Sequence, residues 1–397
     1  MTGTMSRDAA AAHGAMIAAR PTLQGCGPFG SFRDLPGRVL LHAGPPYSGP
    51  EQVPQPVLNS AVSAVLAEGW ATTADAARAM IASREIPMQP AQDHGMVTPL
   101  AFVATPGTPV LRVVDAAGIA PDRFCPVNDG PGDAALRFGG PPNAPRLARL
   151  AAMRDAAPGL DAALSDGVPV LPLMTAGIAA GDDLHGNVAG MTEALAAALL
   201  PRLDGAAHDY VAAAPLFGLN AIMGACAVLF AAAAASGDSD TIIAAGGNGV
   251  DFGWQRADRL GVWQRAAALP PIGPLFTDIP ASRVLPAIGD SAVIDACGFG
   301  GAILRHAPAL RAALAPFHDE SAFALQASAA FSGPHPVFPA DIRVGLRSVD
   351  LWRHPGIMLG MLDMTGDAGL IGRGLAPWPT AAGHAPGRED GGQRRGL

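Results

Sequence analysis

The sequence predicts a mixed α/β fold of several domains, in which a helical subdomain is inserted between two α/β regions. The 397-residue chain is longer than one hydrophobic core usually supports, and 49% of its residues are hydrophobic. Short apolar runs that end in turn formers alternate with helical segments on both sides of a stretch with helical period only. The predicted parts are an N-terminal α/β region (1–144), the helical subdomain (145–204), a C-terminal α/β region (205–378) and a disordered tail (379–397).

The N-terminal region is expected to alternate strands and helices. Residues 38–50, RVLLHAGPPYSGP, are a brief apolar run followed by a Gly-Pro turn, which predicts a short buried strand. A helical hairpin follows, because apolar residues keep helical spacing from Leu58 to Gly69 and the pattern restarts after Thr72. Two further strands are predicted at 109–116 and 124–130.

Helical spacing dominates the chain from Pro145 onward. A first helix is predicted to end at Pro158, and residues 191–199 carry the apolar stripe of another. Residues 216–236 are long and apolar enough to span a membrane. They are rich in alanine and lack flanking basic anchors, so we predict a buried core helix there. Strand-like runs return at 241–249 and 356–364.

The charged residues exclude several functional classes. The chain contains no lysine, so all 26 of its basic residues are arginines. This rules out a Schiff-base lysine, a pyridoxal-phosphate anchor and a P-loop lysine. An anion must therefore be held by arginine, by backbone N–H groups or by a helix N-terminus. The net charge of −8 argues against a nucleic-acid surface and favours small polar substrates or protein partners.

The cysteines and the N-terminus indicate a cytoplasmic protein. The four cysteines lie far apart without a C-x-x-C pair, which indicates neither a disulfide framework nor a thiolate zinc site. The first residues lack the continuous apolar segment of an export signal. Because the composition is so apolar, we expect the chain to assemble with itself or with a partner, without a membrane.

Residues 287–302, AIGDSAVIDACGFGGA, gather glycines around a short apolar segment. The stretch contains an N-cap signal, a C-cap glycine and a glycine pair that leads into another helix. Backbone N–H groups at two helix starts favour an anionic or carbonyl ligand, whereas the alternative is close packing of two crossing helices. The residues assigned to ligand binding are Gly289, Asp290, Ser291, Gly300 and Gly301. Because Asp290 would repel an anion, we expect its carboxylate to cap the backbone or orient a donor.

Two loops, GDDLHGN (181–187) and QDHG (92–95), place carboxylates beside an imidazole. In GDDLHGN these are the residue types that proton transfer or a hard-metal site needs. The alternatives are a helix-capping loop, in which Asn187 caps the next helix, and a merely exposed histidine. Neither spacing fixes a coordination set, so no metal site is assigned. The residues assigned to catalysis are Asp93, His94, Asp182 and His185.

A third loop, GGNGVDFG (246–253), follows an apolar strand. Tight turns around Asn248 suit a binding loop at the end of a strand. The segment is not a dinucleotide fingerprint, because the G-x-G-x-x-G order and the following helix are missing.

Several motifs taken in order resemble the YlbE-like family: LLHAGPP, QDHG, VNDGPG with LRFGG, GDDLHGN, NGVDFG and IGDSAVIDACGFGG. The resemblance spans roughly residues 16–377. Better-known members of this family serve as a subunit of oxamate carbamoyltransferase beside an FdrA-like subunit and a third protein. The resemblance implies a multidomain α/β fold with an inserted helical part, transfer of a carbamoyl group between oxamate and phosphate, and no P-loop or redox cofactor.

The resemblance also implies roles for single residues. His94, Asp182, His185, Asn248 and the Asp290–Ser291 pair match motif positions of the family, Asp93 stands where the family tends to have Glu, and Asn128 of VNDGPG is assigned to substrate binding. The chain departs from the family at Ala91 and Gln92 (expected Cys-His), Gly247 (expected Arg) and Met364 (near an expected Lys).

The sequence therefore predicts a carbamoyltransferase-type subunit that acts on a small amide or carboxylate of the oxamate or oxalurate type. Arginines and backbone amides would neutralise the anions, while a loop His or Asp would handle the proton. Two alternatives remain: a non-catalytic scaffold that docks an FdrA-like subunit, and a divergent enzyme with another acyl or amide substrate. The expected partners are a small anionic substrate, an FdrA-like subunit and a third subunit, and further copies of the chain. No cofactor is expected.

Overall fold

A computed structural model of the protein describes residues 6–318 and 330–379, and it has the mixed α/β fold that the sequence predicts. The predicted tail, apart from Pro379, lies outside the described residues. The α-helices are α1 (Arg7–Ala18), α2 (Gln55–Ala67), α3 (Ala74–Ala82), α4 (Ala144–Leu164), α5 (Val170–Ala179), α6 (Ala189–Leu199), α7 (Gly205–Ala212), α8 (Phe217–Ala234), α9 (Ala292–Cys297) and α10 (Pro308–Leu314). The strands are β1 (Pro21–Pro28), β2 (Leu40–His42), β3 (Met88–Pro90), β4 (Pro109–Asp115), β5 (Arg123–Pro126), β6 (Val168–Pro169), β7 (Ile242–Asn248), β8 (Asp251–Arg256), β9 (Gln264–Ala267), β10 (Ile288–Gly289), β11 (Phe331–Pro334), β12 (Arg343–Leu346), β13 (Ile357–Leu362) and β14 (Leu370–Ala376).

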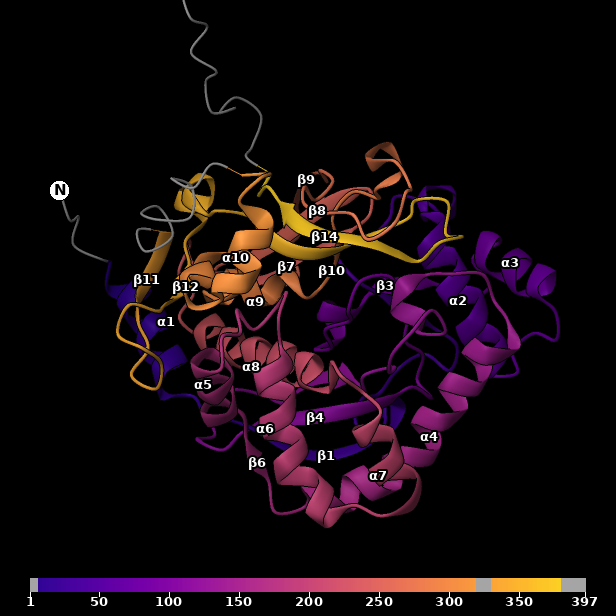
Figure 1. The fold of residues 1–397 in the computed structure, drawn as a ribbon, viewed down its shortest axis with the longest axis horizontal. Helices are drawn as coiled ribbons and strands as arrows, with labels where there is room; N and C mark the ends of the chain where they lie inside the picture. Colours follow the sequence, from indigo (N-terminus) through magenta and orange to yellow (C-terminus); the bar gives the residue numbers. More distant parts are fainter. Residues whose placement is uncertain (1–5, 319–329, 380–397) are drawn as a thin grey trace, which may run out of the picture.

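Two antiparallel four-stranded sheets form the frame of the molecule. Their strand orders are β5-β4-β1-β6 and β10-β7-β8-β9. Smaller pairs complete the strands: β11-β12 and β13-β14 are antiparallel and β2-β3 is parallel. In Figure 1 the first sheet lies in the lower half of the molecule and the second in the upper half, with α8 between them.

Helix α8 is the core helix that residues 216–236 predict. Among the described residues it is the helix long and apolar enough to cross a membrane, but 94% of that window is buried inside the protein. It packs on β4 and β5 of the first sheet and on β7 of the second. Its polar residue Asn220 donates to the carbonyl of Pro126 and accepts from Asn128, so burial leaves no amide group unpaired.

Helix α4 differs from the sequence expectation, because it continues through Pro158 to Leu164 instead of ending at the Pro-Gly pair. Packing explains the extension, since Leu160 and Leu164 are fully buried in the core. A Cβ at Gly159 would lie 2.6 Å from the Cβ of Ala207 in α7. The glycine therefore serves the close approach of two helices and does not stop the first one.

The other predicted elements are present with small shifts in their ends. The predicted strands correspond to β2, β4, β5, β7 and β13, and the helical hairpin to α2 and α3. The segment 145–204 is mainly helical, and it also contains β6, which pairs with β1, and the GDDLHGN loop between α5 and α6. One hydrophobic core includes residues of all three predicted parts, among them Met16, Met153 and Ile357. The division into separate domains stays a prediction.

Candidate functional site

The GDDLHGN loop is held by its two aspartates. Asp182 accepts hydrogen bonds from the N–H groups of Gly190 (3.1 Å) and Met191 (2.7 Å), so its carboxylate caps the start of α6. Asp183 is fully buried and accepts from three N–H groups of the same loop, those of His185, Gly186 and Asn187. Burial raises the pKa of Asp183, and these bonds oppose the rise. The helix-capping alternative is therefore correct for this loop: Asp182 forms the shorter bonds to the start of α6, and Oδ1 of Asn187 accepts a longer one from the N–H of Ala189 (3.4 Å).

The loop fixes His185 against a carboxylate that lies 110 residues further along the chain. Nδ1 of His185 is 2.6 Å from Oδ2 of Asp295 in α9. An ionised carboxylate only accepts hydrogen bonds, so Nδ1 carries the proton and Nε2 is left as the proton acceptor. The residue before the histidine, Leu184, has a φ of +67°, a conformation that costs energy for a residue with a Cβ. A histidine held in one tautomer is suited to proton transfer.

Asp295 also explains the glycine-rich stretch 287–302. Its Oδ1 accepts from the N–H groups of Gly301 (2.8 Å) and Met358 (3.1 Å). Gly300, with a φ of +59°, packs so closely that a Cβ there would overlap this carboxylate. The stretch gives a carboxylate access to a main-chain donor, as the sequence suggested, but that carboxylate belongs to the chain itself. The N–H of Gly300 is not free for a ligand either, because it donates to the carbonyl of Asp183.

Asp290 does not cap α9, whose N-cap is Ser291 without a side-chain cap bond. Its buried carboxylate accepts from the N–H groups of Gly44 (2.8 Å) and Thr98 (2.9 Å) and from Nε2 of Gln92 (2.6 Å). Burial raises the pKa of Asp290 to about 7, against these hydrogen bonds. Asp290 thus holds three loops together, which agrees with the expectation that it binds backbone rather than an anion.

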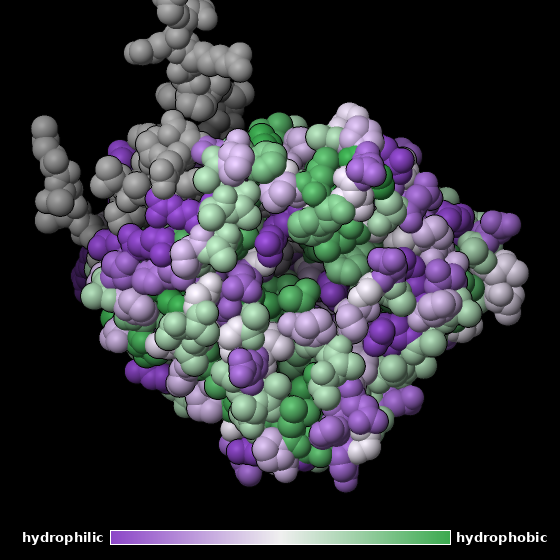
Figure 2. All heavy atoms as spheres, in the orientation of Figure 1, coloured by the Kyte–Doolittle hydropathy of each residue, from purple (hydrophilic) through white to green (hydrophobic). Residues whose placement is uncertain are grey.

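A pocket of about 160 Å³ lies where these elements meet. His185 and Ser291 line it together with two arginines that sequence reasoning did not select, Arg137 and Arg373. The other lining residues are Pro99, Leu100, Phe138, Gly186, Leu216, Leu219, Phe276, Met358, Leu359, Gly360, Leu370 and Gly372. Figure 2 shows that the face drawn in Figure 1 is hollowed near its centre, below β14. We call this pocket the histidine pocket.

Arg373 is the arginine of the histidine pocket that pairs with no carboxylate among the described residues. It extends from β14, and one terminal nitrogen donates to the carbonyl of Gly186. Its Nε is buried without a hydrogen-bond partner among the described residues, and no carboxylate pairs with its guanidinium there. Arg137 differs, because it is buried and paired with Asp129. An unpaired guanidinium beside an apolar wall favours a carboxylate or phosphate ligand.

The backbone is strained at two sides of the histidine pocket. Leu100, which lines it, has a φ of +45°, and Leu184 adjoins His185. Among the described residues only Arg84 also has a positive φ without being glycine. A Cβ at Gly289 would lie 2.8 Å from the nitrogen of Leu100, so the glycine admits this loop. Such strain gathers at functional sites and supports the choice of this pocket.

The remaining residues selected from the sequence lie elsewhere. Asn128 and Asn248 are buried and hold turns: their amides donate to the carbonyls of Leu216 and Pro45. His94 lies 2.7 Å from Oε1 of Gln89. Asp93 accepts from Gln255 and Trp263 beside a second groove. The structure thus brings together His185 and Ser291 and does not bring the other candidates into the histidine pocket.

The departures from the expected family pattern have structural counterparts. Gly247 stands where arginine was expected, and a Cβ there would overlap the carbonyl of Ala287. Gln92, in place of a histidine, bridges Asp290 and the carbonyl of Ala245. Met364 is exposed. In the part of the chain that the structure describes, no group of three or more His, Cys, Asp or Glu side chains is placed to hold a metal ion.

Sequence reasoning missed Asp295, Arg137 and Arg373. Arg373 left a signal, because it is the charged residue in the otherwise apolar strand LIGRGLA. Arg137 stands in the LRFGG motif. Asp295 looked like part of a short apolar helix, and only the contact with His185 shows its role.

A family model and two relatives match the chain in sequence, and a solved structure matches its fold. The family model described as oxamate carbamoyltransferase subunit AllG matches residues 86–291. Oxamate carbamoyltransferase subunit AllG of Escherichia coli K12 is 31% identical over 286 residues, which cover 68% of this chain and 67% of that protein. The uncharacterized protein YahG of the same organism is 27% identical over 344 residues, which cover 84% of this chain and 68% of that protein. A solved structure of a conserved protein of unknown function from Enterococcus faecalis V583 covers 94% of each chain with a TM-score of 0.85 and 23% identity, which shows the fold alone.

Proposed function

Because the chain belongs to the family of oxamate carbamoyltransferase subunit AllG, we propose that it is a subunit of a carbamoyltransferase of this type and that the histidine pocket is its substrate site. The observation that carries the proposal is the pairing of His185 with Asp295 beside Arg373, whose guanidinium has no carboxylate partner among the described residues. The pocket thus offers one group to move a proton and another to hold an anion.

The pocket fits a small anionic substrate. Oxamate and its carbamoyl derivative are compact carboxylates, and about 160 Å³ accommodates a molecule of that size. Arg373 would bind the carboxylate or the phosphate, with Ser291 as a further hydrogen-bond partner. Phe138 and Met358 supply apolar wall, which lowers the local dielectric and strengthens these contacts.

The proposed reaction moves one carbamoyl group and one proton. An oxygen of hydrogen phosphate attacks the carbamoyl carbon of N-carbamoyl oxamate, a C–O bond forms, and the C–N bond to the oxamate nitrogen breaks. Nε2 of His185 takes the proton from hydrogen phosphate and delivers it to the leaving nitrogen, while Asp295 stabilises the imidazolium between the two transfers. The products are carbamoyl phosphate and oxamate, and the reverse reaction uses the same groups.

The partners belong to the same proposal. An FdrA-like subunit and a third subunit would complete the enzyme with this chain.

The chain is therefore assayed alone and together with the products of its neighbouring genes, with N-carbamoyl oxamate and phosphate as substrates and carbamoyl phosphate as the measured product. His185→Gln is compared with His208→Gln, a matched control because His208 is exposed on α7 and pairs with Asp209.

The proposal expects product from the complex, a loss of about 100-fold or more in kcat for His185→Gln, and no loss for His208→Gln. A complex that stays fully active with His185→Gln would refute the catalytic role and leave the chain as a scaffold for the other subunits. A complex active on other amides but inactive on N-carbamoyl oxamate would show a divergent enzyme instead.

A further inference from the structure

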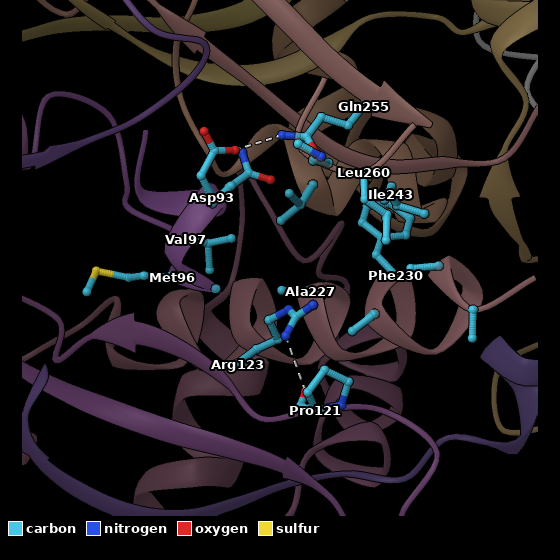
Figure 3. A pocket seen from close by; sticks show the side chains of 18 residues that line it. Asp93, Met96, Val97, Pro121, Arg123, Ala227, Phe230, Ile243, Gln255 and Leu260 are labelled. Atoms are coloured by element: carbon cyan, nitrogen blue, oxygen red, sulfur yellow. Dashed lines mark hydrogen bonds between the residues drawn. The ribbon is translucent and has the colours of Figure 1, made fainter. Parts of the chain in front are cut away.

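A second groove, of about 440 Å³, lies between α8 and the segments around β5, β7 and β8. Its walls come from parts of the chain that are far apart in sequence, as the close-up in Figure 3 shows. The histidine pocket shares none of its lining residues. The proposed function makes no use of this groove, which we call the α8 groove.

Most of the α8 groove is apolar. Phe230, Ile243 and Leu260 line it, together with three alanines of α8 (Ala227, Ala231 and Ala234) and its C-cap Ala235. Leu260 is 62% exposed, so an apolar side chain stands at the opening without burying its surface within the chain. An apolar body on a ligand would cover Leu260 and the half-buried Ile243, and the area removed from water would stabilise the complex.

The polar lining groups lie at two separate places. Asp93 and Gln255 are hydrogen-bonded to each other at 2.9 Å on one side, and Arg123 lies on another, near Pro121 (Figure 3). Asp93 also accepts from Nε1 of Trp263 at 3.0 Å. A second anion beside this carboxylate would be repelled, so the groove suits a ligand with one negative charge, placed at Arg123.

Arg123 forms no ion pair among the described residues, although the charge of the neighbouring Asp122 acts on it. Its terminal nitrogen donates to the carbonyl of Asp122 at 3.1 Å, while the Asp122 carboxylate pairs with Arg112. A Cβ built on Gly95 would have Nη1 of Arg123 at 3.8 Å and Nη2 of Arg33 at 3.9 Å. Burial and the neighbouring Arg33 lower the pKa of Arg123 to about 10, which still leaves it charged at neutral pH.

The charge of Arg33 repels that of Arg123, although Arg33 does not line the α8 groove, and an anion bound on Arg123 would reduce this repulsion. We propose that the α8 groove binds a small amphipathic monocarboxylate, with its carboxylate on Arg123 and its aliphatic or aromatic body along α8 against Phe230. The bound molecule would lie beside α9, because Val293 of that helix lines the α8 groove and Ser291, its N-cap, lines the histidine pocket.

The test is isothermal titration of the full chain with hexanoate and benzoate, compared with acetate, which lacks the apolar body, and with 1-hexanol, which lacks the charge. Arg123→Gln removes the charge. Leu260→Asp places an opposing charge at the opening, and because Leu260 is mostly exposed the replacement removes little buried area. Arg38→Gln is the matched control, because Arg38 is exposed and pairs with Glu85 away from the groove. Thermal unfolding of each variant shows that it is folded.

Hexanoate or benzoate is expected to bind at least about tenfold more tightly than acetate and hexanol, and each groove variant is expected to lose about tenfold in affinity. Arg38→Gln should bind as the parent does. Arg373→Gln, which alters the histidine pocket, should also keep the affinity, so the result is independent of the proposed function. Equal binding of hexanoate by the parent and Arg123→Gln, equal binding of hexanoate and hexanol, or no binding at millimolar concentration would overturn the proposal.

Discussion

Replacing Asp295 by asparagine changes the protonation of His185 while keeping the shape of the site. The amide oxygen can still accept from the N–H groups of Gly301 and Met358, at the present 2.8 and 3.1 Å. The amide nitrogen then faces Nδ1 of His185, and since it can only donate, the imidazole must carry its proton on Nε2. Nε2 can no longer take a proton from the nucleophile.

The magnitude follows from these contacts. A positioned general base contributes about 10²- to 10⁴-fold to a rate, so kcat is expected to fall by that factor. Two hydrogen bonds to a carboxylate become bonds to a neutral amide, which weakens each by about 1 kcal/mol. Burying an amide costs less than burying a carboxylate, and this offsets part of the loss. The free energy of unfolding should therefore decrease by only about 1–2 kcal/mol.

The assay combines the steady-state kinetics of the assembled enzyme with denaturant unfolding of the isolated chain. A large loss of kcat with a small loss of stability is the expected result. If Asp295→Asn kept the parent's kcat, the His185–Asp295 pair would not take part in proton transfer. A variant that failed to fold would show that Asp295 is mainly structural, and His185→Gln would then report the catalytic role.

Three further predictions address residues selected from the sequence. Gly300→Val should destabilise the fold by about 3–5 kcal/mol in denaturant unfolding, because φ is +59° and a Cβ would overlap Asp295. The control Gly14→Ala should not, because the space around its Cβ is open. Equal stability of the two variants would contradict the described packing at Gly300. Burial raises the pKa of Asp290 from 3.8 to about 7, so its contribution to stability is complete below about pH 4 and is lost as the pH rises to 7. The free energy of unfolding, measured across this pH range, should decrease by that contribution, and Asp290→Asn should not show the decrease. Asp182→Ala should cost about 1–2 kcal/mol as a lost cap and reduce kcat far less than Asp295→Asn; an equal loss of kcat would restore its catalytic assignment.

The fold was predictable where local sequence decides it. The apolar run of residues 216–236 indicated a core helix, and α8 is that helix. Glycine and proline were misleading in α4, because Gly159 is required by the contact with Ala207, a residue of another helix. Strand β14 was not anticipated, since its glycines weaken the pattern and its partner β13 supplies the pairing.

The site was predictable only in part, for a similar reason. His185 and Ser291 stand in motifs that attract notice, and both line the histidine pocket. Their partners come from distant segments: Asp295 lies 110 residues from His185, and Arg373 reaches Gly186 across 187 residues. A single sequence does not show which distant segments come into contact. It also could not show that Asp182 and Asp290 use their carboxylates on backbone N–H groups.

The most direct test of the central claim is isothermal titration of oxamate into the full chain and into Arg373→Gln. The guanidinium of Arg373 pairs with no carboxylate in the described part of the chain, so the parent should bind oxamate and the variant should lose at least about tenfold in affinity. Equal affinity of the two proteins would contradict the assignment of this pocket as the substrate site.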